Sequence, residues 1–288
     1  MEIEERLPRR ARDLLRHFGL RAKKSLGQHF LIDKQVLRCI VSASKLTRED
    51  TVIEIGPGLG ILTTELARQA KQVIAVETDT KLASALSEVI GAFPNISVIN
   101  SDILQTNPAS LLAAGSAELD ELSYKVVANI PYYITAPILR HFLEASPKPS
   151  LIVVMVQKEV GKAIIAQPGE MSLLAVSVQF YGKPKIIDYV SAQSFYPPPK
   201  VDSAILQIEI YKQPLVRVDD NDKFFEVVRA GFSSPRKQLR NSLAQGVGIA
   251  PQVATNLIAG AGINSRLRAE ALNLQEWARL YEAVRDYG

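Results

Sequence analysis

The sequence predicts an α/β fold: a mostly parallel sheet with one antiparallel strand and helices on both faces, followed by a small all-helical domain. From residue 51 onwards, short apolar segments of strand length alternate with helical segments, the order that produces a parallel sheet. After residue 172 two strand-like segments follow each other without a helix, so one antiparallel strand is expected. Beyond residue 220 only helical periodicity remains. We expect one domain over residues 1–212, including an N-terminal extension, and a helical domain over residues 213–288.

Five apolar segments predict the parallel part of the sheet. We expect these strands at 51–55, 72–76, 96–99, 124–128 and 151–156. Their nearly uninterrupted Val, Ile and Leu content is typical of parallel strands that are buried on both faces. One helix is expected at 61–70, directly after a glycine turn. Asp79 can cap a second helix, which carries Leu82, Leu86 and Val89 on one face.

The later elements follow from a change of pattern. A helix is expected at 172–180, and two strands at 185–193 and 201–211. Three consecutive prolines in the connection at 194–200 predict an exposed, extended loop. Residues 212–220 have the pattern of a linker, and about 70 helical residues follow, which must lean on the first domain to bury enough surface. Two apolar helix faces are formed by Phe224, Phe225, Val228 and Phe232, and by Leu274, Trp277, Tyr281 and Val284.

Composition excludes several classes of protein. The chain has 288 residues, of which 47% are hydrophobic and 22% charged, as expected of a folded chain. No apolar run approaches the roughly 20 residues of a membrane helix, and the N-terminus lacks the apolar segment of a secretory signal. A single cysteine, Cys39, forbids an internal disulfide, and with three histidines the chain is poorly equipped for a zinc site. We therefore expect a cytoplasmic protein without a metal or a membrane span.

The charge is unevenly distributed along the chain. Residues 1–24 carry eight basic and four acidic side chains, and residues 223–240 carry five basic and one acidic. The net charge of the whole chain is +4, so the remainder is mildly acidic. Two basic segments on an acidic body predict a localised contact with a polyanion such as a nucleic acid. The alternative is that both segments are solvated helix faces.

A glycine turn, 54–60, closes the first strand of the sheet and opens a helix. Glycines at Gly56, Gly58 and Gly60 permit a tight turn and let the backbone approach a ligand. Their spacing is G-x-G-x-G with Glu54 in front, which differs from the G-x-G-x-x-G of dinucleotide-binding proteins. A glycine triplet by itself is also explained by an ordinary turn.

Two carboxylates follow the next two strands. Glu77 ends the second strand, where its side chain can accept both hydroxyls of a ribose. Asp102 follows the third strand, where it can accept the amino group of an adenine ring. Taken singly, Glu77 can be an exposed acid and Asp102 a helix N-cap. Together with the glycine turn they lie at the carboxyl edge of the sheet and favour an adenosine without a diphosphate, such as S-adenosylmethionine, over NAD.

The segment Asn129-Ile130-Pro131-Tyr132 ends the fourth strand at the same edge. Asn129 offers a side-chain carbonyl and Ile130 a main-chain carbonyl, whereas Pro131 has no N–H to compete for them. Two such acceptors can hold an exocyclic amine and support the positive charge that it gains on methylation, while Tyr132 offers a flat face to a base. Phe195 is a second stacking candidate, or else a core residue. A plain loop-opening turn is the alternative for the whole segment.

The ordered set of motifs resembles the KsgA/RsmA family of small-subunit ribosomal RNA adenine dimethyltransferases. The resemblance covers almost the whole chain: 24–31, 54–60, Glu77, Asp102, 129–132, 157–160, 195–203 and 236–241. It implies a Rossmann-like sheet that binds S-adenosylmethionine. It also implies that this cofactor meets Gln28, His29, Leu31, Gly56, Gly58, Glu77, Asp102 and Asn129. Asn129 is expected beside the target amine as well, and Tyr132 and Phe195 on either face of the adenine.

The family's activity is the transfer of four methyl groups, two to each of two adjacent adenines in a hairpin loop near the 3′ end of 16S rRNA. The resemblance thus implies a partner, the precursor of the small (30S) ribosomal subunit, and we expect a monomer. Arg236, Lys237 and Arg240 are the expected RNA contacts. Three positions depart from the common pattern: His29 stands where many members have Asn, Ile130 where Leu is commoner, and Ser234-Pro235 precedes Arg236.

Three other functions remain in view at this point. A close paralogue could methylate large-subunit rRNA, because the catalytic motifs do not encode the choice of substrate. The protein could act chiefly as an assembly factor that binds immature small subunits and uses methylation as a release signal, which is compatible with the enzyme. A dehydrogenase is opposed by the glycine spacing.

Overall fold

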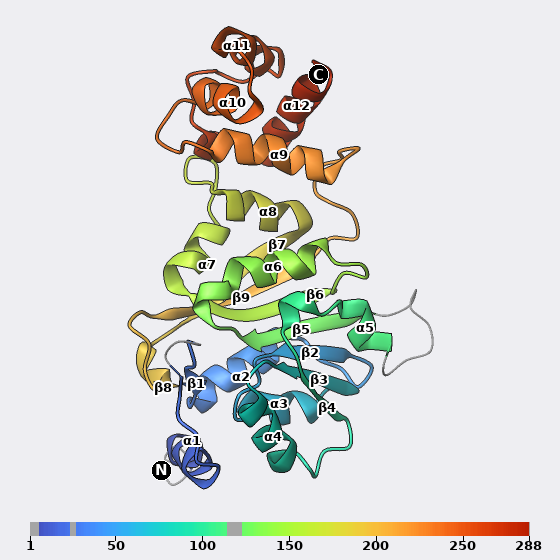
Figure 1. Ribbon diagram of the computed structural model, residues 1–288, viewed down its shortest axis with the longest axis vertical. Coiled ribbons are helices and arrows are strands. Elements are labelled where there is room, and N and C mark those ends of the chain that lie inside the picture. Colours follow the sequence, from blue (N-terminus) through green and yellow to red (C-terminus); the bar gives the residue numbers. More distant parts are fainter. Residues whose placement is uncertain (1–5, 24–26, 114–122, 288) are drawn as a thin grey trace. The chain divides into compact units, whose positions relative to one another are not determined.

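The computed structural model describes residues 6–23, 27–113 and 123–287, with side chains described from residue 11 onwards. The chain divides into two compact units (Figure 1). The first unit contains Met1–Gly161 and Lys185–Ile210, and the second contains Lys162–Pro184 and Tyr211–Gly288. Residues 162–184 thus group with the C-terminal helices. The domain boundary near residue 212 stays a prediction.

A seven-stranded sheet in the order β4-β3-β2-β5-β6-β9-β7 forms the framework of the first unit. The strands from β2 to β6 run parallel to their neighbours, and β9 runs antiparallel to β6. The predicted mixed α/β sheet is therefore confirmed. Its strands are β2 (Thr51–Ile55), β3 (Gln72–Glu77), β4 (Ile96–Asn100), β5 (Tyr124–Asn129), β6 (Leu151–Gln157), β7 (Gly182–Val190) and β9 (Ser203–Ile210).

The strand order reverses between β2 and β5. The chain builds outwards from β2 to β3 and β4, then returns to the other side of β2 with β5 and continues to β6. In open α/β sheets the crevice for a ligand lies at such a reversal, outside the carboxyl ends of the strands. Glu54 to Gly60, Glu77 and Asn129 all follow or end these central strands. The topology therefore brings the sequence motifs to one edge.

Helices cover the sheet, and α4 and α2 each begin at an aspartate cap. Asp79 accepts a hydrogen bond from the Lys81 N–H at 3.1 Å and caps α4, as expected, and Asp33 caps α2 in the same way. The helices before the C-terminal part are α1 (Arg6–His17), α2 (Lys34–Ala43), α3 (Ile61–Ala67), α4 (Thr80–Val89), α5 (Pro108–Ala113), α6 (Thr135–Glu144) and α7 (Lys158–Ile164). Single 3-10 turns lie at η2 (Ile103–Gln105), η3 (Tyr132–Ile134) and η4 (Ala192–Ser194). The helix at α3 ends three residues earlier than expected.

Two very short strands connect distant parts of the first unit. β1 (Phe30–Leu31) pairs antiparallel with β8 (Phe195–Tyr196). The main-chain N–H of Ile32 extends this pairing by donating to the carbonyl of Ser194 at 2.9 Å. The Ser194 hydroxyl also donates to Asp33, at 2.9 Å. We call residues 27–32 the strap, because this segment joins the proline loop to the sheet edge.

The second unit is helical, with an aromatic core. Its helices are α8 (Leu173–Tyr181), α9 (Asn221–Phe232), α10 (Leu239–Val247), α11 (Pro251–Gly260) and α12 (Leu274–Arg285), with a 3-10 turn at η5 (Ala269–Ala271). Phe180 stacks on Phe224 with ring centroids 4.9 Å apart, and Phe232 stacks on Trp277 at 5.5 Å. A Cβ on Gly231 would lie 2.3 Å from the Trp277 ring, so the close approach of α9 and α12 requires glycine there.

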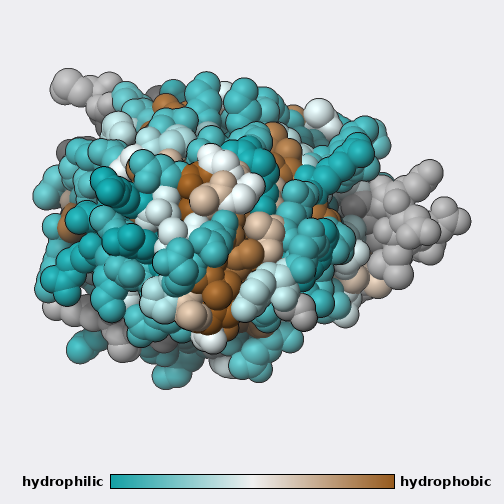
Figure 2. Space-filling view, turned by 90° about the horizontal axis from the view of Figure 1, so that it is seen from above, coloured by the Kyte–Doolittle hydropathy of each residue, from teal (hydrophilic) through white to brown (hydrophobic). Residues whose placement is uncertain are grey.

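The face of the molecule drawn in Figure 2 is predominantly polar. Figure 2 shows one face, on which hydrophilic residues surround a narrow hydrophobic strip. Over the described ranges of the chain, none of the helices combines the length and the apolar character that crossing a membrane requires.

Candidate functional site

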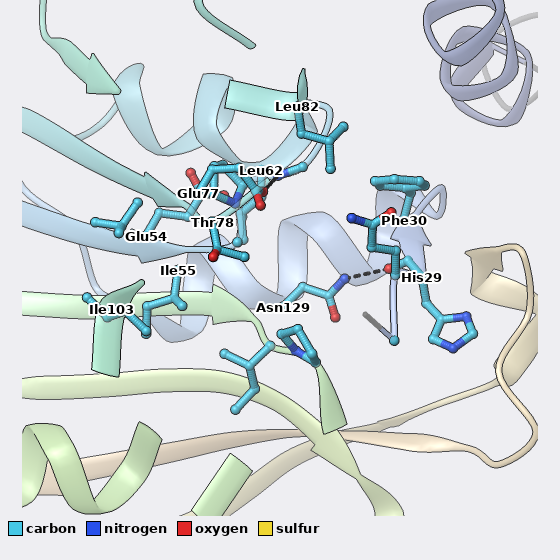
Figure 3. Close-up of a pocket in the computed structure, with 18 of the residues that line it drawn as sticks. His29, Phe30, Glu54, Ile55, Leu62, Glu77, Thr78, Leu82, Ile103 and Asn129 are labelled. Carbon is cyan, nitrogen blue, oxygen red and sulfur yellow. Dashed lines mark hydrogen bonds between the residues drawn. The ribbon is translucent and has the colours of Figure 1, made fainter. Parts of the chain in front are cut away.

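A pocket opens at the carboxyl ends of β2, β3 and β5, where the strand order reverses (Figure 3). It gathers residues from the strap, the glycine turn and the ends of four strands. Every residue predicted to contact the cofactor lines it, together with three further residues of the Asn129 motif. These residues are Gln28, His29, Leu31, Gly56, Gly58, Glu77, Asp102, Asn129, Ile130, Pro131 and Tyr132. The first part of the 24–31 motif, residues 24–26, lies outside the described residues.

The glycine turn has the backbone conformation that its composition predicted. Gly56, Gly58 and Gly60 have φ angles of 62°, 56° and 75°, in the region that favours glycine. A Cβ on Gly58 would lie 3.0 Å from the Phe30 ring of the strap, whereas a Cβ on Gly56 would meet no protein atom within 4 Å. The backbone at Gly56 therefore faces open space and can be approached closely by a ligand.

Glu77 ends β3 and fastens the glycine turn. Its Oε2 accepts the Gly58 N–H at 3.2 Å and its Oε1 accepts the Asp79 N–H at 2.9 Å. Glu77 is only 5% exposed, and this burial raises its pKa, although the two N–H donors act in the opposite direction. The carboxylate is thus held rigidly at the pocket wall.

Asp102 serves as a cap and also lines the pocket. Its Oδ1 accepts the Leu104 N–H at 3.0 Å and caps the η2 turn. The capping role that the sequence also allowed for Asp102 is therefore present. Its Oδ2 is contacted only at 3.4 Å, by the Gln105 amide, among the residues that the structure describes. One oxygen of Asp102 thus remains available to a ligand.

Glu54 is a pocket residue that the sequence reasoning left without a role. Its side chain lines the pocket from β2 and is 1% exposed, and its Oε2 has no hydrogen-bond partner within the described part of the chain. Burial raises its pKa to about 8, the nearby Thr63 hydroxyl lowers it, and the Glu77 carboxylate raises it. At neutral pH this carboxyl is therefore mainly protonated.

The pocket is lined by acidic residues, of which Glu54 is mainly protonated at neutral pH. Glu54, Glu77 and Asp102 line it, and the described lining contains neither lysine nor arginine. A pyrophosphate would meet uncompensated negative charge here, whereas a ligand that carries positive charge is favoured. The acidic lining, the open backbone at Gly56 and the unpartnered oxygen of Glu54 fit a cationic nucleoside such as S-adenosylmethionine better than NAD.

The strap is fixed at both of its ends. The Gln28 side chain accepts the Lys23 N–H at 2.8 Å, and the Lys23 ammonium pairs with the Asp79 carboxylate at 2.6 Å. At the other end the His29 ring nitrogen Nδ1 lies 2.7 Å from the Pro197 carbonyl. The strap therefore ties the loop after β3 to the proline loop, and Leu31 is buried at its centre.

Asn129 has a fixed orientation because the strap uses one end of its amide. Its Nδ2 donates to the His29 carbonyl at 2.9 Å (Figure 3), which leaves Oδ1 without a partner among the described residues. Tyr132 is held next to it: its hydroxyl lies 2.5 Å from the Ser203 hydroxyl and its ring stacks on that of His29 at 6.1 Å. Burial raises the pKa of Tyr132, and the Ser203 contact lowers it.

Four predicted residues lie outside the pocket. Phe195 is 2% exposed and belongs to the hydrophobic core. Arg236 and Lys237 are exposed in the α9–α10 connection of the second unit, and Arg240 is half-buried in α10. Their predicted contacts with RNA stay predictions.

The chain matches known proteins over almost its full length. A family model described as "Ribosomal RNA adenine dimethylase" matches residues 19–286. The protein named "Ribosomal RNA small subunit methyltransferase A" from Dehalococcoides mccartyi is 50% identical over 270 residues, which are 94% of this chain and 91% of that protein. The protein of the same name from Moorella thermoacetica is 42% identical over 279 residues, covering 95% of this chain and 96% of the relative.

Solved structures share the fold. The crystal structure of the 23S rRNA methyltransferase ErmE superposes with a TM-score of 0.67 at 28% identity, covering 89% of this chain and 99% of that chain. A dimethyladenosine transferase from Plasmodium falciparum superposes with a TM-score of 0.74 at 23% identity, covering 90% and 98%. Because the family model and these relatives cover nearly the whole sequence, the chain belongs to the ribosomal RNA adenine dimethylase family.

Proposed function

We propose that this protein transfers methyl groups from S-adenosylmethionine to the N6 amines of two adjacent adenines in the hairpin loop near the 3′ end of 16S rRNA. Its substrate is the rRNA of a small-subunit precursor in the cytoplasm, and it acts as a monomer. The observation that carries the proposal is the fixed amide of Asn129, which lines an acid-lined pocket and whose oxygen has no partner among the described residues. Membership of the family and the names of the relatives support the choice of substrate.

The pocket binds the donor through groups that the structure already holds in place. The backbone at Gly56 and the carboxylates of Glu77 and Asp102 offer acceptors to the methionyl part, the ribose and the adenine of S-adenosylmethionine. The cofactor supplies a methyl group on a positively charged sulfur. The strap covers the pocket through His29 and Leu31, and the ion pair between Lys23 and Asp79 holds it there.

Catalysis follows from positioning. The N6 lone pair of adenine is delocalised into the ring and is a poor nucleophile. Asn129 Oδ1 and the main-chain carbonyl of Ile130 accept the two amine hydrogens, pull the nitrogen towards tetrahedral geometry and stabilise the positive charge that develops on it. No strong base is required before transfer, because the amine becomes acidic only as it gains that charge; one N–H bond then breaks, and the proton goes to water. Placing amine and donor correctly lowers most of the barrier.

Tyr132 provides the stacking surface for the target base. An adenine must leave its stack to enter such a site, at a cost of a few kcal/mol, and stacking on an aromatic ring returns roughly 1–3 kcal/mol. The Ser203 hydroxyl and the His29 ring hold the Tyr132 ring in place. Stacking of Phe195 on the other face requires that this ring leave the core, where it is 2% exposed.

The test is methylation of isolated ribosomal particles. Small subunits that lack the two dimethylated adenines are incubated with the protein and labelled S-adenosylmethionine, and the modified nucleotides are mapped. We expect label at two adjacent adenines near the 3′ end of 16S rRNA and none in large subunits. Label confined to large-subunit rRNA would instead support the substrate of ErmE-like enzymes, and binding of NADH in place of S-adenosylmethionine would support a dehydrogenase.

A variant separates catalysis from an assembly role. Glu77→Ala removes a predicted cofactor contact at the pocket wall and leaves the predicted RNA contacts in the second unit unchanged. We expect the variant to bind small-subunit precursors but not to methylate them. Loss of both properties would mean that the change disrupts the fold rather than the cofactor site.

A further inference from the structure

Glu54 is a buried acid that the proposed chemistry does not use. It comes from the centre of the sheet, where β2 pairs with β3 on one side and β5 on the other. Its side chain is 1% exposed, lines the pocket, and leaves Oε2 without a hydrogen-bond partner in the described residues. An ionised carboxylate in this state would be strongly destabilised, because burial removes its hydration and nothing replaces it.

Glu54 and Glu77 both line the pocket, and their hydrogen bonds decide which of the two carboxyls carries a proton. Glu77 accepts two main-chain N–H groups, from Gly58 and Asp79, and such donors stabilise the ionised form. No main-chain N–H of the described residues donates to Glu54 Oε2; the Thr63 hydroxyl lowers the pKa of Glu54, and the Glu77 carboxylate raises it. The pair is therefore one anion and one neutral acid, with the proton on Glu54.

The described groups around Glu54 offer no positive charge that would stabilise its ionised form. From β3 and the loop after it come Glu77 and Asp79, and Asp79 is already paired with Lys23 at 2.6 Å. Asp102 lines the pocket after β4, and from α3 comes the uncharged hydroxyl of Thr63, which lies near the Glu54 carboxyl and lowers its pKa. A positive charge that enters the pocket therefore meets Glu54 as a buried acid without a basic partner in the described lining, beside the carboxylates of Glu77 and Asp102.

We infer that Glu54 is a proton-exchanging counter-group of the pocket, which holds a proton when the pocket is free and releases it to solvent when a cationic nucleoside binds. The inference rests on the proposed function, because that function supplies the cation. Charge balances in this step: the O–H bond of Glu54 breaks, the proton goes to water or buffer, and the carboxylate stays beside the positive ligand. When methyl transfer removes the sulfonium charge, Glu54 takes a proton back from solvent.

This exchange has a consequence for donor and product. S-adenosylmethionine carries one more positive charge than S-adenosylhomocysteine, so binding of the donor should make Glu54 release a larger fraction of a proton to solvent than binding of the product does. Affinity for the donor should rise with pH, by up to about tenfold per unit, as far as the pKa of the free enzyme, and level off above it. Affinity for the product should rise less. The protein therefore discriminates better against its product at pH 8 than at pH 6.

The experiment is calorimetric titration of the full chain with S-adenosylmethionine and with S-adenosylhomocysteine. At pH 7 each titration is repeated in two buffers of different ionisation enthalpy, which yields the number of protons released. We expect release of up to one proton with the donor and a smaller release with the product. Glu54→Gln, which mimics the neutral acid, should release up to one proton fewer with the donor than the unmodified protein does, and its affinity should change less with pH. Glu88→Gln, on the exposed face of α4, is the matched control and should behave as the unmodified protein.

The outcomes separate this inference from the proposed function. Equal heats in both buffers, or the same pH dependence in Glu54→Gln as in the unmodified protein, would overturn the role of Glu54 while donor binding itself still stood. Failure of the unmodified protein to bind the donor at any pH would overturn the proposed function. If Glu54→Gln does not fold, infrared difference spectra of the unmodified protein decide: a protonated carboxyl band must disappear when the donor binds, and a band that stays refutes the inference.

Discussion

Replacing Gly56 with alanine should damage the cofactor site much more than the fold. Gly56 has a φ of 62° and lines the pocket, and a Cβ there would meet no protein atom within 4 Å. Gly19 offers a matched control: its φ is 60°, a Cβ on it would also meet nothing, and it lies outside the pocket lining. The two substitutions therefore impose the same backbone strain and differ only in what the new methyl group faces.

The magnitudes follow from this geometry. An L-residue in the left-handed region costs roughly 1–2 kcal/mol, so both variants should lose about that much stability. In a chain of this size each kcal/mol lowers the Tm by roughly 2–4 °C. Gly58→Ala should lose about 1–3 kcal/mol of stability in addition to this backbone cost, because its Cβ would lie 3.0 Å from the Phe30 ring. For Gly56→Ala we expect at least about a tenfold loss of affinity for S-adenosylhomocysteine, which corresponds to ~1.4 kcal/mol.

Thermal unfolding and calorimetric titration on the three variants provide the test. The account predicts similar Tm shifts for Gly19→Ala and Gly56→Ala, with weakened ligand binding in the second alone. Unchanged affinity in Gly56→Ala would refute the claim that a ligand approaches this backbone. Equal loss of affinity in both variants would mean that the effect is transmitted through general destabilisation.

Three further predictions concern the target base and the RNA. Asn129→Ala should lower kcat by on the order of 10²–10³-fold, the usual effect of losing one transition-state hydrogen bond. Its RNA affinity should stay within a factor of about two or three of the original. Equal losses in kcat and RNA affinity would indicate misfolding. Tyr132→Phe should keep stacking and most activity, whereas Tyr132→Ala should raise the KM for RNA, and identical kinetics of the two variants would contradict a stacking role. Alanine at Arg236, Lys237 or Arg240 should reduce the log–log salt slope of RNA binding by roughly one unit on duplex RNA, less on single strands. A slope unchanged in all three variants counts against these contacts.

The parallel sheet could be predicted from sequence because its strands are buried on both faces. Val52 and Ile53 are fully buried, and such positions admit only apolar side chains, which leave a visible run in the sequence. The cap at Asp79 was equally visible, because capping depends on a local residue type. Glu77 and Asn129 were placed in the same pocket because the carboxyl ends of neighbouring parallel strands meet at one edge.

Contacts between distant segments left no such signal. The pairing of Phe30–Leu31 with Phe195–Tyr196 involves two residues on each side, too few for a periodic pattern, and its partners lie far apart along the chain. Phe195 is part of that pairing and is buried. Because the pairing could not be seen in the sequence, both a stacking role and a core role remained open for this residue. The protonation of Glu54 could not be predicted from the sequence either, because it depends on the lack of a hydrogen-bond donor to Oε2 among its described neighbours in the fold. A glutamate within an otherwise apolar strand was the one available hint.

The most direct measurement of the central claim is a crystal structure of the protein with S-adenosylhomocysteine and an adenine-containing RNA hairpin. The account predicts the nucleoside between the Gly56 backbone, Glu77 and Asp102, with its sulfur directed towards an adenine amine that contacts Asn129 Oδ1 and the Ile130 carbonyl. A ligand bound elsewhere, or an adenine amine held away from Asn129 while the pocket is filled, would contradict it.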